Sequence, residues 1–484
     1  MIRGLFFYIA SAAACATAAA ETPPLVAAAK NGAPESAFAL IAAGADVNAA
    51  EPDGTTALHW AVRGAAAPLV ELLLGAGAAA GAANRYGVTP LQLAAENGDA
   101  ALIRLLLEEG ADANTVLPEG ETVLMTAART GIVEALNVLL DDGAAIDARE
   151  HWYGESALIW ATVEDHADAV RTLIERGAAV DSRSASQPRE QRRNGQSILP
   201  LGDWTPLMYA AREDARAAAG ALAAASADLD LTDPDGATAL TIAIINANYA
   251  LAVQLLAAGA DPNVVDTAAG MGPLYAAVDM HRLAIGHGRP NPRAVGTLDA
   301  AGVVQALLEH GANPNAQLTK PIMQRHHTAG DGALGVGATP LMRAAKSGDV
   351  AVMKLLLAAG ADPKLAMPSG ATALTYAAGL GWRNGSALAP SYDQGSEAEA
   401  VEAIGLLLDL GLAVDATNAA GNTALHAAVT GRGSAMIIDA LLARGADPNA
   451  ANAKGETPLG LAETRTTPEV VAQLRAVGTR AATP

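Results

Sequence analysis

The sequence predicts an all-helical protein assembled from stacked helix-turn-helix units, and three observations lead to this fold class. A short unit of Gly, any residue, Thr, a small residue and Leu recurs along most of the 484 residues. The usual step from one copy to the next is 33 residues. Apolar residues make up 51% of the chain but aromatic residues only 3%, so packing must rely on small side chains that let helices approach closely.

The recurring unit occurs at nine places, one of them with Ser156 in place of Thr, and is imperfect at two more. Its copies are GTTAL (54–58), GVTPL (87–91), GETVL (120–124), GESAL (154–158), GATAL (236–240), GATPL (337–341), GATAL (370–374), GNTAL (421–425) and GETPL (455–459), with DWTPL (203–207) and GMGPL (270–274) as the imperfect ones. A second unit follows a Leu pair, as GADVN (44–48), GADAN (110–114) and GADPN (259–263 and 445–449). Two alternating units in one period predict two helices per repeat.

Each unit carries residues that begin or end a helix. Thr89 followed by Pro90 is an N-cap with proline at the first helical position. Leu91 and Ala95 then place apolar side chains on one face of a short helix. Gly110 supplies the left-handed residue that ends a second helix. A single unit of this size cannot bury its apolar face, so we expect the units to stack.

These residues resemble the ankyrin repeat, and the resemblance covers roughly residues 24–475. It implies an ankyrin-repeat solenoid of helix-turn-helix units with short hairpin fingers, about eleven repeats plus an N-terminal cap at 24–48, and a tail at 476–484. It also implies a non-catalytic scaffold that binds a partner protein through its concave side, which the finger tips and the exposed ends of the first helices form.

Composition excludes several other classes of function. With 31 Lys and Arg against 51 Asp and Glu, the formal net charge is -20, which argues against a nucleic-acid binder. The single cysteine, Cys15, excludes an internal disulfide and a Cys-based zinc site. No GxSxG, HExxH or GxxxxGK[ST] motif occurs. We therefore expect no enzymatic activity and no cofactor, and we expect a monomer.

Residues 1–20 have the pattern of a bacterial signal peptide. Arg3 precedes an apolar stretch from Leu5 to Ile9, and small residues from Ala18 to Ala20 precede Glu21. We expect export to the periplasm or the extracellular space. In the alternative, a lipoprotein leader ends before Cys15, which becomes the lipidated first residue. Beyond the leader we expect no membrane span.

Four insertions, at about 182–202, 281–299, 316–336 and 379–398, interrupt the 33-residue period. Insertions on a rigid scaffold are frequent sites of function. The first three contain nine basic residues against three acidic ones, on an acidic chain: Arg183, Arg189, Arg192, Arg193, Arg282, Arg289, Arg293, Lys320 and Arg325. Such a local positive field would attract an acidic partner, whereas the plainer interpretation is that loops need solvated side chains.

The partner-binding candidates combine this basic set with scarce aromatic residues at finger tips and in the fourth insertion. They are Tyr86, Trp152, Tyr153, Arg189, Arg192, Arg193, Arg289, Arg325, His326, His327, Trp382 and Tyr392. Trp60, Trp160, Tyr209 and Tyr376 instead precede paired small residues of a first helix, which predicts core positions.

Two other functions remain open from the sequence. His281, His287, His326 and His327 lie on two insertions and are candidate ligands of a transition metal, which would make the insertions a metal or small-molecule pocket. His59, His310 and His426 fit positions of the repeat and are expected to be structural. The second alternative is a secreted effector that binds a host protein.

Overall fold

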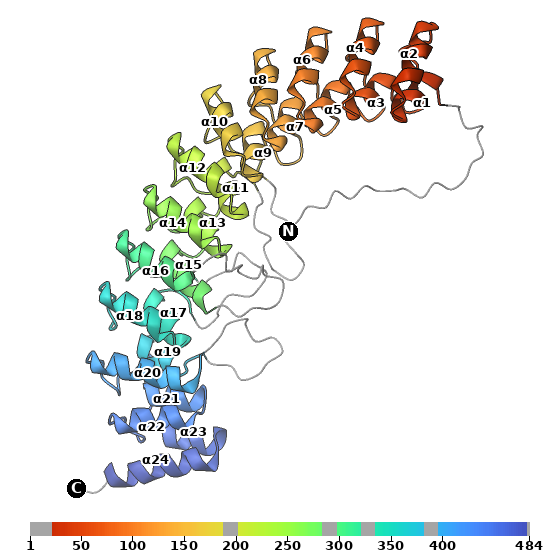
Figure 1. Cartoon of the computed structure of the whole chain (residues 1–484). Helices are drawn as coiled ribbons and strands as arrows, with labels where there is room; N and C mark the ends of the chain where they lie inside the picture. Colours follow the sequence, from red (N-terminus) through yellow and green to blue (C-terminus); the bar gives the residue numbers. More distant parts are fainter. Residues whose placement is uncertain (1–21, 187–201, 283–297, 321–333, 382–394, 482–484) are drawn as a thin grey trace. The chain divides into compact units, whose positions relative to one another are not determined.

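The computed structural model describes residues 22–186, 202–282, 298–320, 334–381 and 395–481 (Figure 1). These described residues form 24 helices and no named β-strand. The predicted all-α class is confirmed. The leader, Cys15 and most of each insertion lie outside the described residues. Within the described part, none of the helices combines the length and the apolar character needed to cross a bilayer.

The chain divides into two compact units, residues 1–151 and 152–484, which are described separately. The first unit contains α1 (Pro24–Lys30), α2 (Pro34–Ala42), α3 (Ala57–Arg63), α4 (Ala67–Gly75), α5 (Pro90–Asn97), α6 (Ala100–Glu108), α7 (Val123–Thr130) and α8 (Val133–Asp141).

The second unit contains α9 (Ala157–Val163), α10 (Ala167–Glu175), α11 (Pro206–Glu213), α12 (Arg216–Ala224), α13 (Ala239–Ile245), α14 (Tyr249–Ala257), α15 (Pro273–His281), α16 (Ala300–Glu309), α17 (Pro340–Lys346), α18 (Val350–Ala358), α19 (Ala373–Ala377), α20 (Glu397–Asp409), α21 (Ala424–Thr430), α22 (Ala435–Ala443), α23 (Pro458–Arg465) and α24 (Pro468–Ala481). Helix α24 thus continues past residue 476, into the segment expected to be a tail.

Consecutive helices pair, and the pairs stack in two layers within each unit (Figure 1). In the first unit α1, α3, α5 and α7 contact one another in order, and in the second unit the odd-numbered helices from α9 to α23 do the same. Even-numbered helices form the other layer. The core between the layers consists of Leu, Val, Ile and Ala side chains, such as Leu91, Ala95 and Leu106, all at most 1% exposed.

The Thr of each Gly-x-Thr unit begins a first helix, as predicted. The Thr89 hydroxyl accepts the backbone N–H of Gln92 at 3.2 Å, and Pro90 occupies the first helical turn. In α3 and α21 a histidine completes a reciprocal cap. The Nδ1 of His59 lies 2.8 Å from the Thr56 hydroxyl, and His426 pairs with Thr423 in the same way. Both histidines are 1% exposed, so their predicted structural role is confirmed.

The fingers between pairs are tight turns with isolated antiparallel bridges, such as Ala50 to Thr56 and Thr232 to Thr238. Glycine is required where successive fingers touch. Gly236 has a φ of 84°, and a Cβ at this position would lie 2.6 Å from the backbone nitrogen of Thr267 in the next finger. Any other residue would strain the turn and push the two fingers apart.

The Asn of the GADxN unit makes its hydrogen bonds to the next repeat, so its role appears only once the repeats are stacked. Asn114 donates from Nδ2 to the carbonyl of Gly143 at 3.1 Å and accepts at Oδ1 from Ala145 N–H at 2.8 Å. One side chain therefore satisfies two backbone groups at the end of the next second helix. At Asp181 the carboxylate only accepts, from Asp228 N–H at 3.2 Å. Burial and the negative charge of Asp228 raise the pKa of Asp181, although the hydrogen bond from Asp228 N–H and the charge of Arg183 lower it.

We predict opposite effects of exchanging Asn and Asp at these two positions. Asn114→Asp removes the donor to Gly143 and should lower the free energy of unfolding by up to about 1 kcal/mol. Asp181→Asn removes a desolvated carboxylate near Asp228 and should leave the stability unchanged or higher. Urea unfolding of both variants beside the parent tests this. A destabilisation by Asp181→Asn equal to that by Asn114→Asp would contradict the proposed role of the donor.

Candidate protein-binding surface

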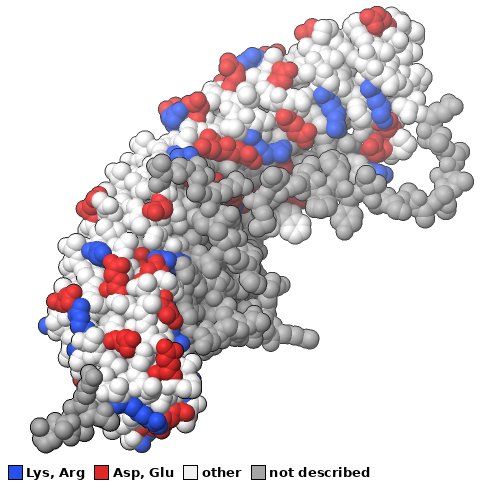
Figure 2. All heavy atoms as spheres, turned by 60° about the horizontal axis from the view of Figure 1, so that its bottom comes forward, with Lys and Arg blue, Asp and Glu red and all other residues white. Residues whose placement is uncertain are grey.

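We call the surface formed by the finger tips and the last turns of the odd-numbered helices the finger face. In the first unit, Lys30, Arg63, Glu96 and Arg129 occupy the same position of α1, α3, α5 and α7, each 33 residues after the previous one, and all four are exposed. Stacking turns this sequence spacing into a row of charges. Figure 2 shows basic and acidic side chains interspersed over the visible surface rather than separated by sign.

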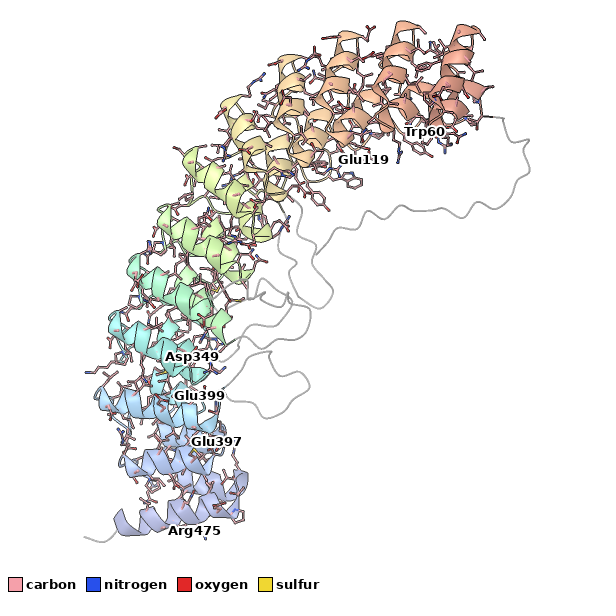
Figure 3. All side chains as sticks on the ribbon, viewed as in Figure 1. Trp60, Glu119, Asp349, Glu397, Glu399 and Arg475 are labelled. Carbon is pink, nitrogen blue, oxygen red and sulfur yellow. The ribbon has the colours of Figure 1, made fainter. Side chains whose placement is uncertain are left out.

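Trp60 joins this surface instead of the core (Figure 3). Its indole N–H donates to Glu51 at 2.9 Å, and Lys30 pairs with the other oxygen of the same carboxylate at 2.9 Å. The Lys30 ammonium lies 4.6 Å from the centre of the indole ring, and the Arg63 guanidinium lies 5.9 Å from it. The predicted core position is therefore half-buried, because the side chain lies over the layer and not between the layers.

Glu96 and Tyr86 extend the finger face of the first unit. Nearby groups desolvate Glu96 and raise its pKa, although Arg129 and Arg63 oppose this effect. Tyr86 is 54% exposed at a finger tip, where the Arg85 guanidinium lies 4.8 Å from the centre of its ring. An ordered aromatic ring with a cation beside it is suited to contact a protein partner.

In the second unit, Trp152 and Tyr153 form the tip of the first finger and are 64% and 40% exposed. The carbonyl of Tyr153 accepts the N–H of Ala185 at 2.6 Å, which ties this finger to the next one. The two residues thus have the exposure that interface anchors need.

Two of the four aromatic side chains predicted to be core are buried. Tyr209 is 4% exposed and Tyr376 is 2% exposed, whereas Trp160 is half-buried like Trp60. Burial raises the pKa of Tyr209, and the charge of Glu155 raises it further. The Arg212 guanidinium stacks 4.9 Å from the centre of the Tyr209 ring, so cations and aromatic rings also adjoin in this unit.

The basic residues that the structure describes at the insertions make contacts within the chain. Arg183 donates from Nη1 to the carbonyl of Asp203 at 2.8 Å and to that of Thr232 at 2.9 Å. Lys320 donates to a carbonyl at 3.1 Å, and Arg282 pairs with a carboxylate at 2.6 Å. For these three, neither interpretation of the charge pattern applies as stated, because each side chain bonds to another part of the chain.

The remaining candidates lie outside the described residues. They are Arg189, Arg192, Arg193, His287, Arg289, Arg293, Arg325, His326, His327, Trp382 and Tyr392. Of the candidate metal ligands, His281 is described, and its Nδ1 lies 2.5 Å from Asp349. The described part of the chain contains no group of three or more His, Cys, Asp or Glu side chains placed to hold a metal ion.

A cavity of about 200 Å³ opens between the last fingers and first helices of the second unit. Ala427 and Leu461 contribute apolar surface to it, and Lys454, Glu456 and Arg465 contribute charged groups. Sequence reasoning gave no sign of it, because its lining comes from three successive repeats.

Stacked helix pairs joined by fingers define a class of helical repeat protein. Models of ankyrin repeats match residues 25–116, 93–184, 190–285, 297–385 and 407–462. The chain therefore belongs to the ankyrin-repeat family. Ankyrin repeats indicate a protein–protein interaction domain, and the fold is typically a non-catalytic scaffold.

Individual relatives match only part of the chain. A 123-residue stretch is 32% identical to the B-cell lymphoma 3 protein homolog of Mus musculus and covers 25% of this chain and 23% of that protein. The chain thus spans less than a quarter of that relative's length. The human ASB11 ankyrin repeat domain, a crystal structure, shares 29% identity with a TM-score of 0.38, over 46% of this chain and 91% of that one.

We predict that Arg183 is structural, in contrast to an arginine of the finger face. Arg183→Met should lower the free energy of unfolding by about 1 to 2 kcal/mol, because two carbonyls lose a charged donor. Arg85→Met, which removes contacts of an exposed guanidinium with the neighbouring Tyr86 and the charge of Asp53, should change stability little. Urea unfolding curves of both variants decide the matter, and equal stability of Arg183→Met and the parent would refute the assignment.

Proposed function

We propose that this protein is an exported bacterial scaffold of about eleven ankyrin repeats plus an N-terminal cap, and that it binds a partner protein in the cell envelope. The observation that carries the proposal is the finger face, on which stacking aligns charged residues from successive repeats of the first unit and on which each unit also carries exposed aromatic rings. Rows of this kind provide many separate contacts along an extended partner rather than one reactive centre.

The partner is expected to contact the finger face and the central insertions. Trp152 and Tyr153 are the best-placed anchors of the second unit, because large aromatic side chains at 64% and 40% exposure have much area left to bury. An acidic partner is supported only by the insertion residues that lie outside the described part of the chain, together with Arg85 beside Tyr86. Charge would then influence mainly the rate of association.

The affinity for the partner should fall when the aromatic anchors are removed. We expect Trp152→Ala with Tyr153→Ala to weaken binding by at least about tenfold, since buried aromatic anchors contribute about 2 kcal/mol or more each at interfaces. The mature chain, residues 21–484, serves as bait in envelope extracts, and the affinity for each retained protein is then measured with purified components. Undiminished affinity of the double variant would exclude this finger from the interface.

Two further baits test whether the partner binds at the finger face or at the insertions. One changes Arg189, Arg192, Arg193, Arg289 and Arg325 to Glu. A smaller control for charge reversal elsewhere changes the exposed helix residues Arg104 and Lys354 to Glu. Loss of binding only in the first bait supports an acidic partner at the insertions. Retention by both returns the interaction to the finger face. Capture only from host-cell extracts would favour a secreted effector over an envelope scaffold.

The export proposal predicts a processed N-terminus. The mature protein recovered from an expressing bacterium should begin near Glu21, and it should fractionate with the envelope or the medium. Cys15→Ala distinguishes the two leaders, because it abolishes membrane attachment of a lipoprotein but leaves cleavage before Glu21 unchanged. Mass spectrometry of the intact protein measures both, and an unprocessed chain retained in the cytoplasm would disprove export.

A further inference from the structure

Four charged side chains join three successive helix pairs of the second unit. His281 ends α15, and its Nδ1 lies 2.5 Å from Oδ2 of Asp349, the N-cap residue of α18. Arg282 follows His281, lies 3.8 Å from the same carboxylate, and pairs with Glu399 of α20 at 2.6 Å. Figure 3 shows Asp349 and Glu399 on the same side of this unit. We call these four residues the His281 cluster.

The His281 cluster is largely shielded from water. The side chain of Asp349 is 1% exposed, those of His281 and Arg282 are 21% and 22% exposed, and that of Glu399 is 35% exposed. Asp349 also accepts the N–H of Val352 at 3.3 Å, which begins α18. A carboxylate at this depth needs a cation beside it, so the state of His281 bears directly on the start of α18.

The reach of Arg282 is unusual for a stacked-repeat architecture, in which each repeat contacts mainly its neighbours. Helices α15 and α20 belong to pairs that are separated by the α17–α18 pair. Arg282 nevertheless bridges 117 positions of sequence to Glu399. Through Asp349 and Glu399 it holds the end of α15, the start of α18 and the start of α20 together.

We propose that the His281 cluster is a pH-responsive lock: while His281 is protonated, its ion pair with Asp349 stabilises the helix pairs from α15 to α20 against opening, and these pairs open as one cooperative block. When His281 is neutral, Asp349 keeps only Arg282, at the longer distance, as its cation. The block then loses its closest ion pair and opens more readily. The inference concerns the array itself and holds whatever the partner protein is.

The other charged groups around His281 favour its protonated form on balance. Asp349 from α18 raises its pKa most, through the hydrogen bond, and Asp299 at the start of α16 also raises it, while burial and Arg282 lower it. From α17, which also packs against α15, Arg343 pairs with Asp279 of α15 at 2.6 Å, and Lys346 is the other charged residue of that helix. Helix α13, which also contacts α15, has no charged residue.

His281 is the member of the cluster whose charge changes near neutral pH. The hydrogen bond from Ser396 N–H and the Arg282 guanidinium lower the pKa of Glu399 to about 2, and an arginine stays charged throughout. Because the pKa of His281 is raised in the folded protein, its contribution is complete below about pH 6.5, the ordinary value for histidine. That contribution is lost as the pH rises through the folded pKa.

Hydrogen exchange of the mature chain, followed by mass spectrometry at about pH 5.5 and about pH 8.5, tests the proposal. After correction for the intrinsic pH dependence of exchange, protection of α15, α18 and α20 should fall together by about fivefold at the higher pH, because a hydrogen bond between two charged groups is stronger than one with a neutral donor. Protection of α3 and α5 in the first unit should not follow this fall.

Three variants make the test specific. His281→Gln keeps a donor for Asp349 but cannot titrate, so its protection should be the same at both pH values. His310→Gln, the control, changes an exposed histidine that bonds a carbonyl of its own helix and should keep the fall. Asp349→Asn preserves the N-cap acceptor but not the charge, and it should remove the pH dependence as well.

The outcomes are distinct. A fall in the parent and in His310→Gln that is absent from His281→Gln and Asp349→Asn establishes the lock. An equal fall in His281→Gln and the parent, or no fall in the parent, overturns it. A fall confined to α15 alone would overturn the cooperative block, since the three elements would then open independently. Failure of Asp349→Asn to fold leaves the comparison of His281→Gln with His310→Gln decisive.

Discussion

Each helix pair buries its apolar face only against the neighbouring pairs, and the other features of the chain depend on this contact. The Leu and Ala side chains that recur every 33 residues are the ones that make it, and they are nearly all inaccessible to water. Because alanine is abundant and aromatic residues are few, the layers can approach closely with little variation from pair to pair. A regular period then gives every surface position a defined neighbour in the next repeat.

Polar side chains also form their hydrogen bonds either within one repeat or with the neighbouring repeat. Thr89 begins a helix within its own repeat, whereas Asn114 satisfies backbone groups of the repeat that follows. Successive fingers can touch where glycine leaves room for the neighbouring backbone, as at Gly236. These polar devices contribute little individually, but they fix the register of the stack, and a fixed register is what aligns Lys30, Arg63 and Arg129 on one face.

Where an insertion interrupts the 33-residue period, residues at its base form ion pairs or hydrogen bonds to carbonyls of the repeats. Arg183 seals the base of the first insertion and Arg282 lies at the base of the second. The charge pattern that suggested a binding surface therefore combines two roles. The described basic residues at the bases of the insertions stabilise the fold. An interaction with an acidic partner would depend on the basic residues of the insertions that lie outside the described part of the chain. The His281 cluster adds a connection between repeats that are not neighbours.

The sequence by itself determined the all-α repeat fold, the caps such as Thr89 and the structural histidines, because these depend on residues within one or two repeats. Exposure of Trp152 and Tyr153 also followed from their place at a finger tip. Only the tertiary structure decided that Trp60 lies over the layer, that Glu51 pairs with Lys30, and that Arg282 reaches Glu399. Such contacts join positions whose distance along the chain follows no period, so they exist only once the pairs are stacked.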